Sequence, residues 1–140
     1  MRFLTLTIVL AVSLNASCTR SPPSYDQMST GQKKFALAKE EIRELVAIKL
    51  GAFATDRIMV EGRKIGYMYR EIPARPEDSG WRFFSGDEDQ AYIDDLSHTG
   101  VYAVNTVANS DPDIIPYLNT PAPCAFEKVA GTNKYRRVAR

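Results

Sequence analysis

Residues 78–89 read DSGWRFFSGDED and concentrate turn-forming, aromatic and acidic side chains. The first glycine predicts a loop, and the aromatic run over residues 81–84 predicts a short buried strand with Trp81 in the core. Ser85, followed three residues later by Glu88, is typical of the capping box that opens a helix. We therefore expect a strand, a turn and a helix in this order.

The acidic side chains of this region are the main candidates for binding a partner. Between Glu77 and Pro123 the sequence has nine carboxylates and one cation, Arg82, so the local net charge is minus eight. A surface of one charge sign predicts a partner with a matching basic surface. The helix expected over residues 87–95 supplies the acids of this predicted partner-binding face: Asp87, Glu88, Asp89, Asp94 and Asp95. The alternative is a solvated helix surface whose first acids stabilise the positive helix end.

These acids match no catalytic or metal-binding pattern. A calcium loop of the EF-hand type needs oxygen ligands at alternate positions and a glycine at the sixth, and residues 87–92 fail at the fifth and sixth. Adjacent acids on one helical turn do not establish the paired carboxylates of a glycosidase. His98 is the only histidine, so no second imidazole completes a zinc site. The sequence predicts no catalytic residue, no metal and no cofactor.

Five segments carry a resemblance to a known family. They are YRE at 69–71, DSGWRFFSGDE at 78–88, YAVNT at 102–106, DPDIIPYL at 111–118 and AFE at 125–127. Together they resemble family thirty-three of the bacterial immunity proteins of polymorphic toxin systems, over about residues 58–128. The resemblance implies a small, non-enzymatic domain that blocks a toxin by binding it. Pro123-Cys124 departs from the smaller, glycine-containing sequence expected there.

The N-terminus has the pattern of a secretory signal. Arg2 precedes an apolar run that ends in small residues and Cys18. The run is too short to span a bilayer permanently, and its ending resembles the bacterial lipoprotein processing site. We predict a signal peptide over residues 1–17, lipidation of Cys18 and a location in the cell envelope, anchored to a membrane or periplasmic. Ordinary cleavage near Ala16 is the alternative, and it would leave Cys18 able to form a disulfide with Cys124.

The remaining charges exclude one class of partner. Removal of residues 1–17 leaves equal numbers of cations and anions, which predicts no nucleic-acid partner. Residues 18–27 contain Pro22-Pro23 and are expected to form a tether. Residues 131–140 are expected to form a loose basic tail. A single domain over residues 28–130 lies between them.

The domain is expected to be α+β. Apolar residues recur at helical spacing after Ser29 and predict an amphipathic helix that ends near Leu50 (Phe35, Ala38, Ile42, Leu45, Val46). Strands are expected at 57–60, 65–72, 81–84, 101–104 and 126–129, the first two as a hairpin, with helical turns at 105–109 and 111–118. The predicted architecture is a small, mainly antiparallel sheet with the N-terminal helix packed on one face.

Tyr67 and Tyr69 alternate to one face of the second strand, which is either the buried face of the sheet or a binding platform. For function, the first hypothesis is an exported, lipid-anchored binding domain of the immunity type, whose partner is a basic toxin or another envelope protein. The alternative is an envelope lipoprotein that binds a small ligand or has a structural role.

Overall fold

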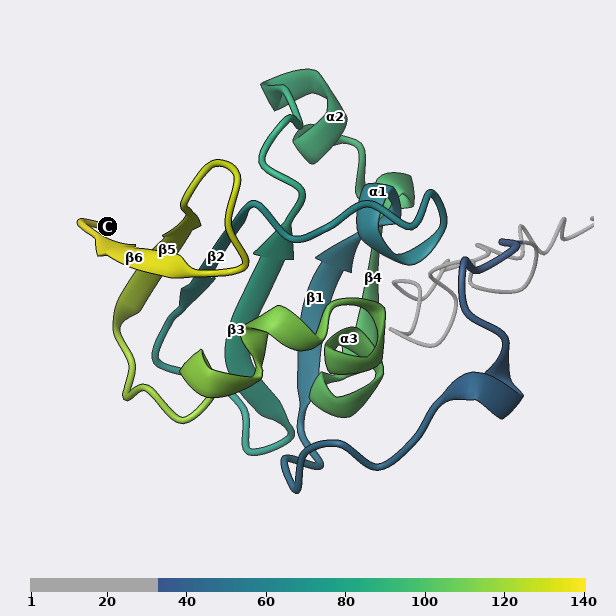
Figure 1. Ribbon diagram of the computed structural model, residues 1–140, viewed down its shortest axis with the longest axis horizontal. Helices are drawn as coiled ribbons and strands as arrows, with labels where there is room; N and C mark the ends of the chain where they lie inside the picture. Colours follow the sequence, from purple (N-terminus) through teal and green to yellow (C-terminus); the bar gives the residue numbers. More distant parts are fainter. Residues whose placement is uncertain (1–32) are drawn as a thin grey trace, which may run out of the picture.

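The computed structural model describes residues 33–140, which fold as a six-stranded mixed sheet with helices packed on one face (Figure 1). The strands are β1 (Gly51–Thr55), β2 (Tyr67–Arg70), β3 (Asp78–Phe84), β4 (Thr99–Ala103), β5 (Cys124–Lys128) and β6 (Tyr135–Val138). Their order across the sheet is β4-β1-β3-β2-β5-β6. Only β1 and β3 pair in parallel, and the other four neighbouring pairs are antiparallel. The predicted α+β class is confirmed.

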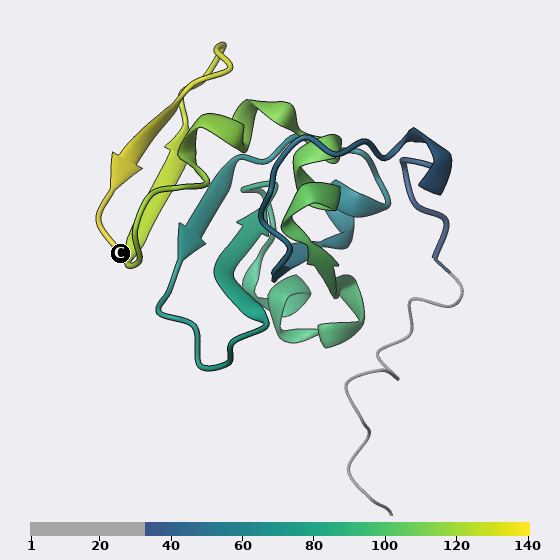
Figure 2. The ribbon, with the colours of Figure 1, turned by 90° about the horizontal axis from the view of Figure 1, so that it is seen from below.

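The helices are short. They are α1 (Asp56–Met59), α2 (Gln90–Asp94), α3 (Val104–Ser110) and the 3-10 helices η2 (Lys39–Glu41), η3 (Leu96–His98) and η4 (Pro112–Tyr117). Seen after a quarter turn, α1, α3 and η4 lie on one side of the sheet, whereas its other face is open (Figure 2). We call the uncovered side the open face.

Side chains along β3 alternate between the two faces of the sheet. Trp81 and Phe83 point toward the helices and are 0% and 1% exposed, whereas Arg82 and Phe84 point to the open face and are half-buried. The indole Nε1–H of Trp81 donates to the carbonyl of Leu118, which directly follows η4, at 3.2 Å, so its one polar group is satisfied in the core. The prediction that Trp81 is a core residue is confirmed.

The predicted N-terminal amphipathic helix is wrong for the residues that the structure describes. Residues 33–50 run as irregular and extended chain across the helical side, with η2 as their one helical turn. Two asparagines of α3 hold this strap. Asn105 Oδ1 accepts from the backbone N–H groups of Leu45 and Val46 at 2.8 and 3.1 Å, and Asn109 Oδ1 accepts from that of Arg43 at 2.9 Å. These amides are therefore bonded to α3 rather than within a helix of their own.

The predicted hairpin is also wrong, because residues 56–59 form α1 instead of a strand. In this turn Ile58 and Met59 are adjacent in sequence and both buried in the core. β2 pairs with β3 and β5, so the strands next to it come from later in the chain.

The C-terminal segment is not a loose tail, because β6 pairs with β5 in antiparallel register. Tyr135 is buried, and its hydroxyl donates to the carbonyl of Ile65 at 2.6 Å. The folded part therefore continues past residue 130. The predicted signal peptide, Cys18 and the tether lie outside the described residues.

Candidate functional site

Glu88 closes a tight loop between β3 and α2. Its carboxylate accepts hydrogen bonds from the backbone N–H groups of Ser85 and Gly86, both at 2.8 Å, and from the hydroxyl of Thr55 at 2.6 Å. Burial acts to raise the pKa of Glu88, but these hydrogen bonds outweigh it and hold the pKa below its usual value. Glu88 is thus an anion whose oxygens are committed to the fold of the loop.

Asp87 faces two arginines from the segment around α1. Its carboxylate pairs with Arg57 at 3.4 Å and makes a closer contact with Arg63. A hydrogen bond from the Ser85 hydroxyl, together with these cations, lowers the pKa of Asp87. Arg57 and Arg63 precede the acidic run in sequence, so folding brings positive charge to a stretch that looked uniformly negative.

The other three predicted acids lie on or beside α2. Asp89 caps this helix by accepting from the backbone N–H of Tyr92 at 2.8 Å, so the helix begins at Gln90, three residues later than expected. Asp95 caps η3 through the backbone N–H of Ser97 at 3.0 Å, and hydrogen bonds from Ser97 lower its pKa. Asp94 is exposed and bonds only the Gln90 amide of its own helix among the described residues.

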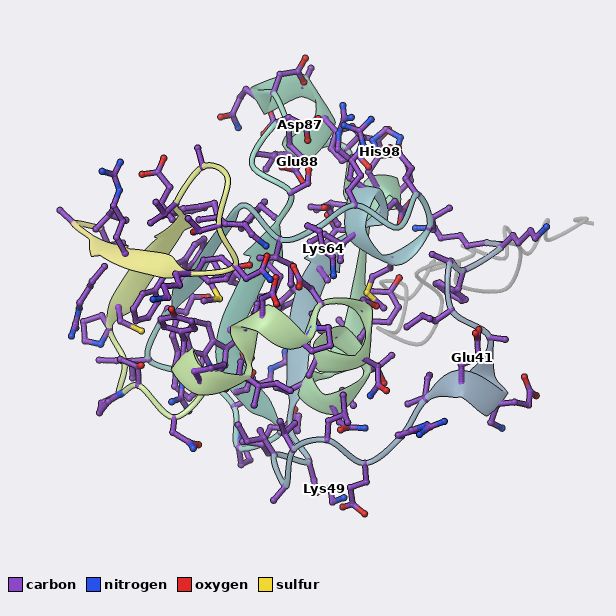
Figure 3. All side chains as sticks on the ribbon, viewed as in Figure 1. Glu41, Lys49, Lys64, Asp87, Glu88 and His98 are labelled. Atoms are coloured by element: carbon purple, nitrogen blue, oxygen red, sulfur yellow. The ribbon has the colours of Figure 1, made fainter. Side chains whose placement is uncertain are left out.

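The five predicted acids therefore gather in one projecting unit at the end of the sheet, which we call the acidic lobe (residues 85–98). Figure 3 shows Asp87 and Glu88 at its base, beneath α2. Four of the five carboxylates serve the local structure, and Asp94 is the one most available to a partner. Partner binding by this lobe stays a prediction.

Other acids of the region also have partners inside the fold. Asp111 is fully buried and accepts from the backbone N–H of Ile65 at 2.9 Å, with the ammonium groups of Lys64 and Lys128 within 3.3 and 3.8 Å. Asp78 binds the guanidinium of Arg82 through both oxygens, and this pairing lowers its pKa. Arg82 is already counted in the local charge of minus eight, and cations from outside residues 77–123 compensate part of that charge in three dimensions (Arg57, Arg63, Lys64, Lys128).

Tyr67 and Tyr69 lie on the open face instead of the buried one. Met68 between them is 0% exposed and aligns with Phe83 of β3 and Phe126 of β5, so the core takes the opposite side of β2. Of the two alternatives, the buried face of the sheet is wrong, and a binding platform fits the half-buried position of the two tyrosines.

A groove on the open face runs between this platform and the acidic lobe. Its floor is formed by three aromatic rings. The Tyr69 ring stacks on the Phe84 ring with 5.8 Å between their centroids, and the centroid of Tyr67 lies 6.1 Å from that of Phe84. Its volume is about 580 Å³, and Glu88 and Ile93 line its acidic-lobe side. We call this feature the tyrosine groove.

Close approach of two loops shapes one wall of the tyrosine groove. A side chain at Gly66 would place its Cβ only 2.1 Å from the carbonyl oxygen of Ser85, so position 66 requires glycine. Glu127 of β5 also lines the groove. The floor is therefore aromatic, and carboxylates border it from two elements.

The C-terminal residue reaches the edge of this aromatic floor. The guanidinium of Arg140 lies 4.3 Å from the ring centroid of Tyr69 and pairs with Glu71 at 2.9 Å. Burial and the nearby Glu71 carboxylate raise the pKa of Tyr69, so the ring stays neutral beneath the cation. Sequence alternation identified the tyrosines as a candidate platform, but nothing local in the sequence places Arg140 beside them.

A second hollow of about 340 Å³ lies at the other side of the open face, around Phe53 of β1 and Val101 of β4. Arg82 stacks over the Phe53 ring at 4.5 Å there. The open face therefore has two hollows, each with an aromatic ring and an arginine.

His98 is a packing residue in the structure. Its ring stacks on Tyr92 at 4.2 Å between centroids, which joins η3 to α2 (Figure 3). Within residues 33–140 no group of three or more histidine, cysteine, aspartate and glutamate side chains is placed to hold a metal ion. Over the same residues, no helix has the length and apolar character needed to cross a membrane.

Comparison with known proteins identifies the family. The family model described as the immunity protein Imm33 domain matches residues 52–139, which span β1 to β6 and include the acidic lobe and the tyrosine groove. The match extends the similarity noted for residues 58–128 at both ends. Searches among curated proteins and among solved structures returned no match. The chain belongs to the Imm33 immunity protein domain family.

Proposed function

We propose that this protein neutralises a bacterial toxin by binding to it. The observation that supports this function is the Imm33 match, which covers every strand of the sheet. Immunity domains act on a cognate toxin, so a toxin is the partner that family membership favours. In this proposal the protein acts by covering the toxin's working surface and performs no chemistry of its own.

The proposed contact includes the acidic lobe, and the matching surface of the toxin is basic. Asp94 is the acid with the least local engagement, and Ile93 beside it is 37% exposed, so the lobe offers charge and apolar surface together. Opposite charges mainly raise the association rate and select the partner. Binding should therefore weaken as salt is added.

We also propose that the chain is exported and lipid-anchored through Cys18. The apolar run followed by small residues and this cysteine supports the idea. A blocker tethered outside the cytoplasm meets only toxins that act on the cell wall, the membrane or periplasmic proteins. Labelling cells with a palmitate analogue should mark the natural protein and leave Cys18→Ala unlabelled, and an unlabelled natural protein would contradict lipidation.

The neutralising function is tested by survival. Cells export a candidate toxin domain, chosen from the genes that neighbour this one, with or without the natural protein. We expect the natural protein to restore growth, and a version exported without Cys18 to protect less because it is no longer held at the membrane. Equal killing with and without the natural protein, when both proteins are present in the envelope, would contradict the proposed function.

A further inference from the structure

We propose that the tyrosine groove receives an arginine side chain of the toxin, and that Arg140 occupies the edge of this site in the free protein. The inference rests on the proposed function for the identity of the partner. The chemistry of the site, however, is argued from residues of this chain alone.

The contact made by Arg140 shows what the groove can bind. Its guanidinium lies over Tyr69 at 4.3 Å and pairs with Glu71 at 2.9 Å, so one cation uses the face of a ring and a carboxylate at once. This is the combination that suits a planar guanidinium better than an ammonium group. Arg140 lies beyond β6 and its side chain is 38% exposed, so it can be displaced without disturbing the sheet.

The rest of the groove extends the same chemistry beyond the reach of Arg140. Tyr67 and Phe84 continue the aromatic floor, and Glu88 and Glu127 line the groove, with the Glu127 carboxylate paired to Arg136 at 2.8 Å. Lys128 lines the groove too, but its ammonium group pairs with Asp113 at 3.1 Å. The pKa of Glu88 lies below its usual value because hydrogen bonds from Thr55 and the loop outweigh the effect of burial, so this side of the groove is anionic at neutral pH. An incoming guanidinium therefore meets aromatic faces below it, and the anionic Glu88 lines the same groove.

The surroundings favour a protein over a small molecule as the source of the arginine. The groove lies on an open sheet face, and the second hollow, around Phe53, lies on the same face. Exposed apolar side chains flank the two hollows, with Ile93 37% and Val101 48% exposed. Aromatic, arginine and aliphatic side chains spread over one face are typical of the core of a protein interface.

The first experiment tests the groove without any toxin. The probe is the blocked tripeptide acetyl-Gly-Arg-Gly-amide, titrated against the full chain while the ring resonances of Tyr67 and Tyr69 are followed by NMR. Arg140→Ala should bind it about tenfold more tightly than the natural chain, because no internal arginine must leave. Tyr69→Leu in the same background should lose that gain. The peptide with citrulline, which has nearly the same shape but no charge, is the matched control and should not bind.

Equal affinity of the natural chain, Arg140→Ala and the Tyr69→Leu double variant for the arginine peptide would overturn the proposal. Binding of the citrulline peptide as tightly as the arginine peptide would also overturn it, because the site would then not select the cation.

The second experiment uses the same candidate toxin domain as the survival test. Tyr69→Leu and Phe84→Leu should each weaken its binding at least about tenfold, with unchanged melting temperature. Leu45→Ser is the control, since Leu45 is 42% exposed on the strap, on the other side of the sheet. If the natural chain binds and both groove variants bind equally well, this inference fails and the proposed function stands. If the natural chain does not bind the toxin, the proposed function fails. The peptide titration then still shows whether the groove binds an arginine side chain.

A second copy of this chain is the competing occupant. Sedimentation of the natural chain as a dimer that Tyr69→Leu dissociates would assign the groove to self-association and overturn the proposal.

Discussion

The hydroxyl of Thr55, at the end of β1, donates a 2.6 Å hydrogen bond to the carboxylate of Glu88 in the acidic lobe. This bond joins the central part of the sheet to the loop that leads into α2. The same carboxylate holds the backbone of Ser85 and Gly86, so the position of the lobe above the tyrosine groove depends on one side chain.

Glu88→Gln should destabilise the fold although the two side chains have nearly the same shape. In the natural protein the backbone N–H groups of Ser85 and Gly86 face carboxylate oxygens. The amide of Gln would turn an N–H group toward one of these donors, and the remaining hydrogen bond would lose the negative charge of its acceptor. We expect a loss of about 2 kcal/mol in the free energy of unfolding, measured by urea denaturation. Glu40→Gln, an exposed glutamate in η2, is the control and should change it by less than about 0.5 kcal/mol. Equal stability of both variants would show that Glu88 does not hold the loop.

Stability should fall in acid because the pKa values of Glu88 and Asp78 are lowered in the folded state. A lowered pKa means that the unfolded chain takes up protons first, so the stabilisation is present above about pH 4.5 and is lost as the pH falls through the folded values. Denaturation at a series of pH values should show this decline, with a smaller slope in Glu88→Gln. An identical slope in the variant would contradict the role of this carboxylate.

Trp81→Ala should cost about 3–5 kcal/mol, because it empties the most central position of the core and removes the bond to Leu118. Chemical denaturation measures the loss, and the fluorescence maximum of the natural protein should lie well to the blue of free indole. Leu96→Ala is the control, since Leu96 is 64% exposed. Emission like that of free indole would contradict the burial of Trp81. If Trp81→Ala also loses toxin binding, the loss reflects unfolding of the domain and does not show that Trp81 contacts the toxin.

Asn105→Ala should release residues 43–50 of the strap. Its amide oxygen accepts from Leu45 and Val46, and its amide group donates to the carbonyl of Arg43 at 2.8 Å. We expect a loss of about 1–2 kcal/mol and faster trypsin cleavage after Arg43 and Lys49. Asn119→Ala is the control, because Asn119 is exposed. If trypsin cleaves Asn105→Ala no faster than Asn119→Ala, Asn105 does not hold the strap.

The hydrogen bonds of Asn105 to the strap explain why the N-terminal helix predicted from the sequence was wrong. The apolar spacing that predicted a helix up to Leu50 also suits a strap that buries Phe35 and Val46, and the choice depends on asparagines about sixty positions later. The C-terminal strand is a similar case, because β6 is fixed by its pairing with β5. Local pattern was sufficient only for part of β3: the aromatic run predicted the strand over residues 81–84, but Gly80, where a loop was expected, lies inside the strand.

The candidate site was predictable in part for the same reason. The five acids could be placed together because they share one short stretch, but their internal partners come from elsewhere in the chain. Arg57, Arg63 and Thr55 all precede the lobe by more than twenty residues. The family resemblance depended on ordered motifs and is confirmed over residues 52–139.

The acidic lobe is best probed by Asp94→Lys. Asp95 caps η3, so its reversal would disturb the fold, whereas Asp94 bonds only Gln90 among the described residues. Asp94→Lys should leave the melting temperature nearly unchanged and weaken binding of the toxin. Gln90→Ala is the matched control, because it removes the same hydrogen bond without changing the charge. If both variants bind the toxin equally well at low salt, the acidic lobe is not part of the contact with the toxin.

The most direct test of the account is calorimetric titration of the purified natural chain with the candidate toxin domain chosen from its neighbouring genes. We predict a one-to-one complex with a Kd of about 1 µM or tighter at about 50 mM salt, weakened at least about tenfold at about 300 mM salt. Absence of binding at both salt concentrations, with both proteins folded, would contradict the claim that this protein is a toxin-binding immunity protein.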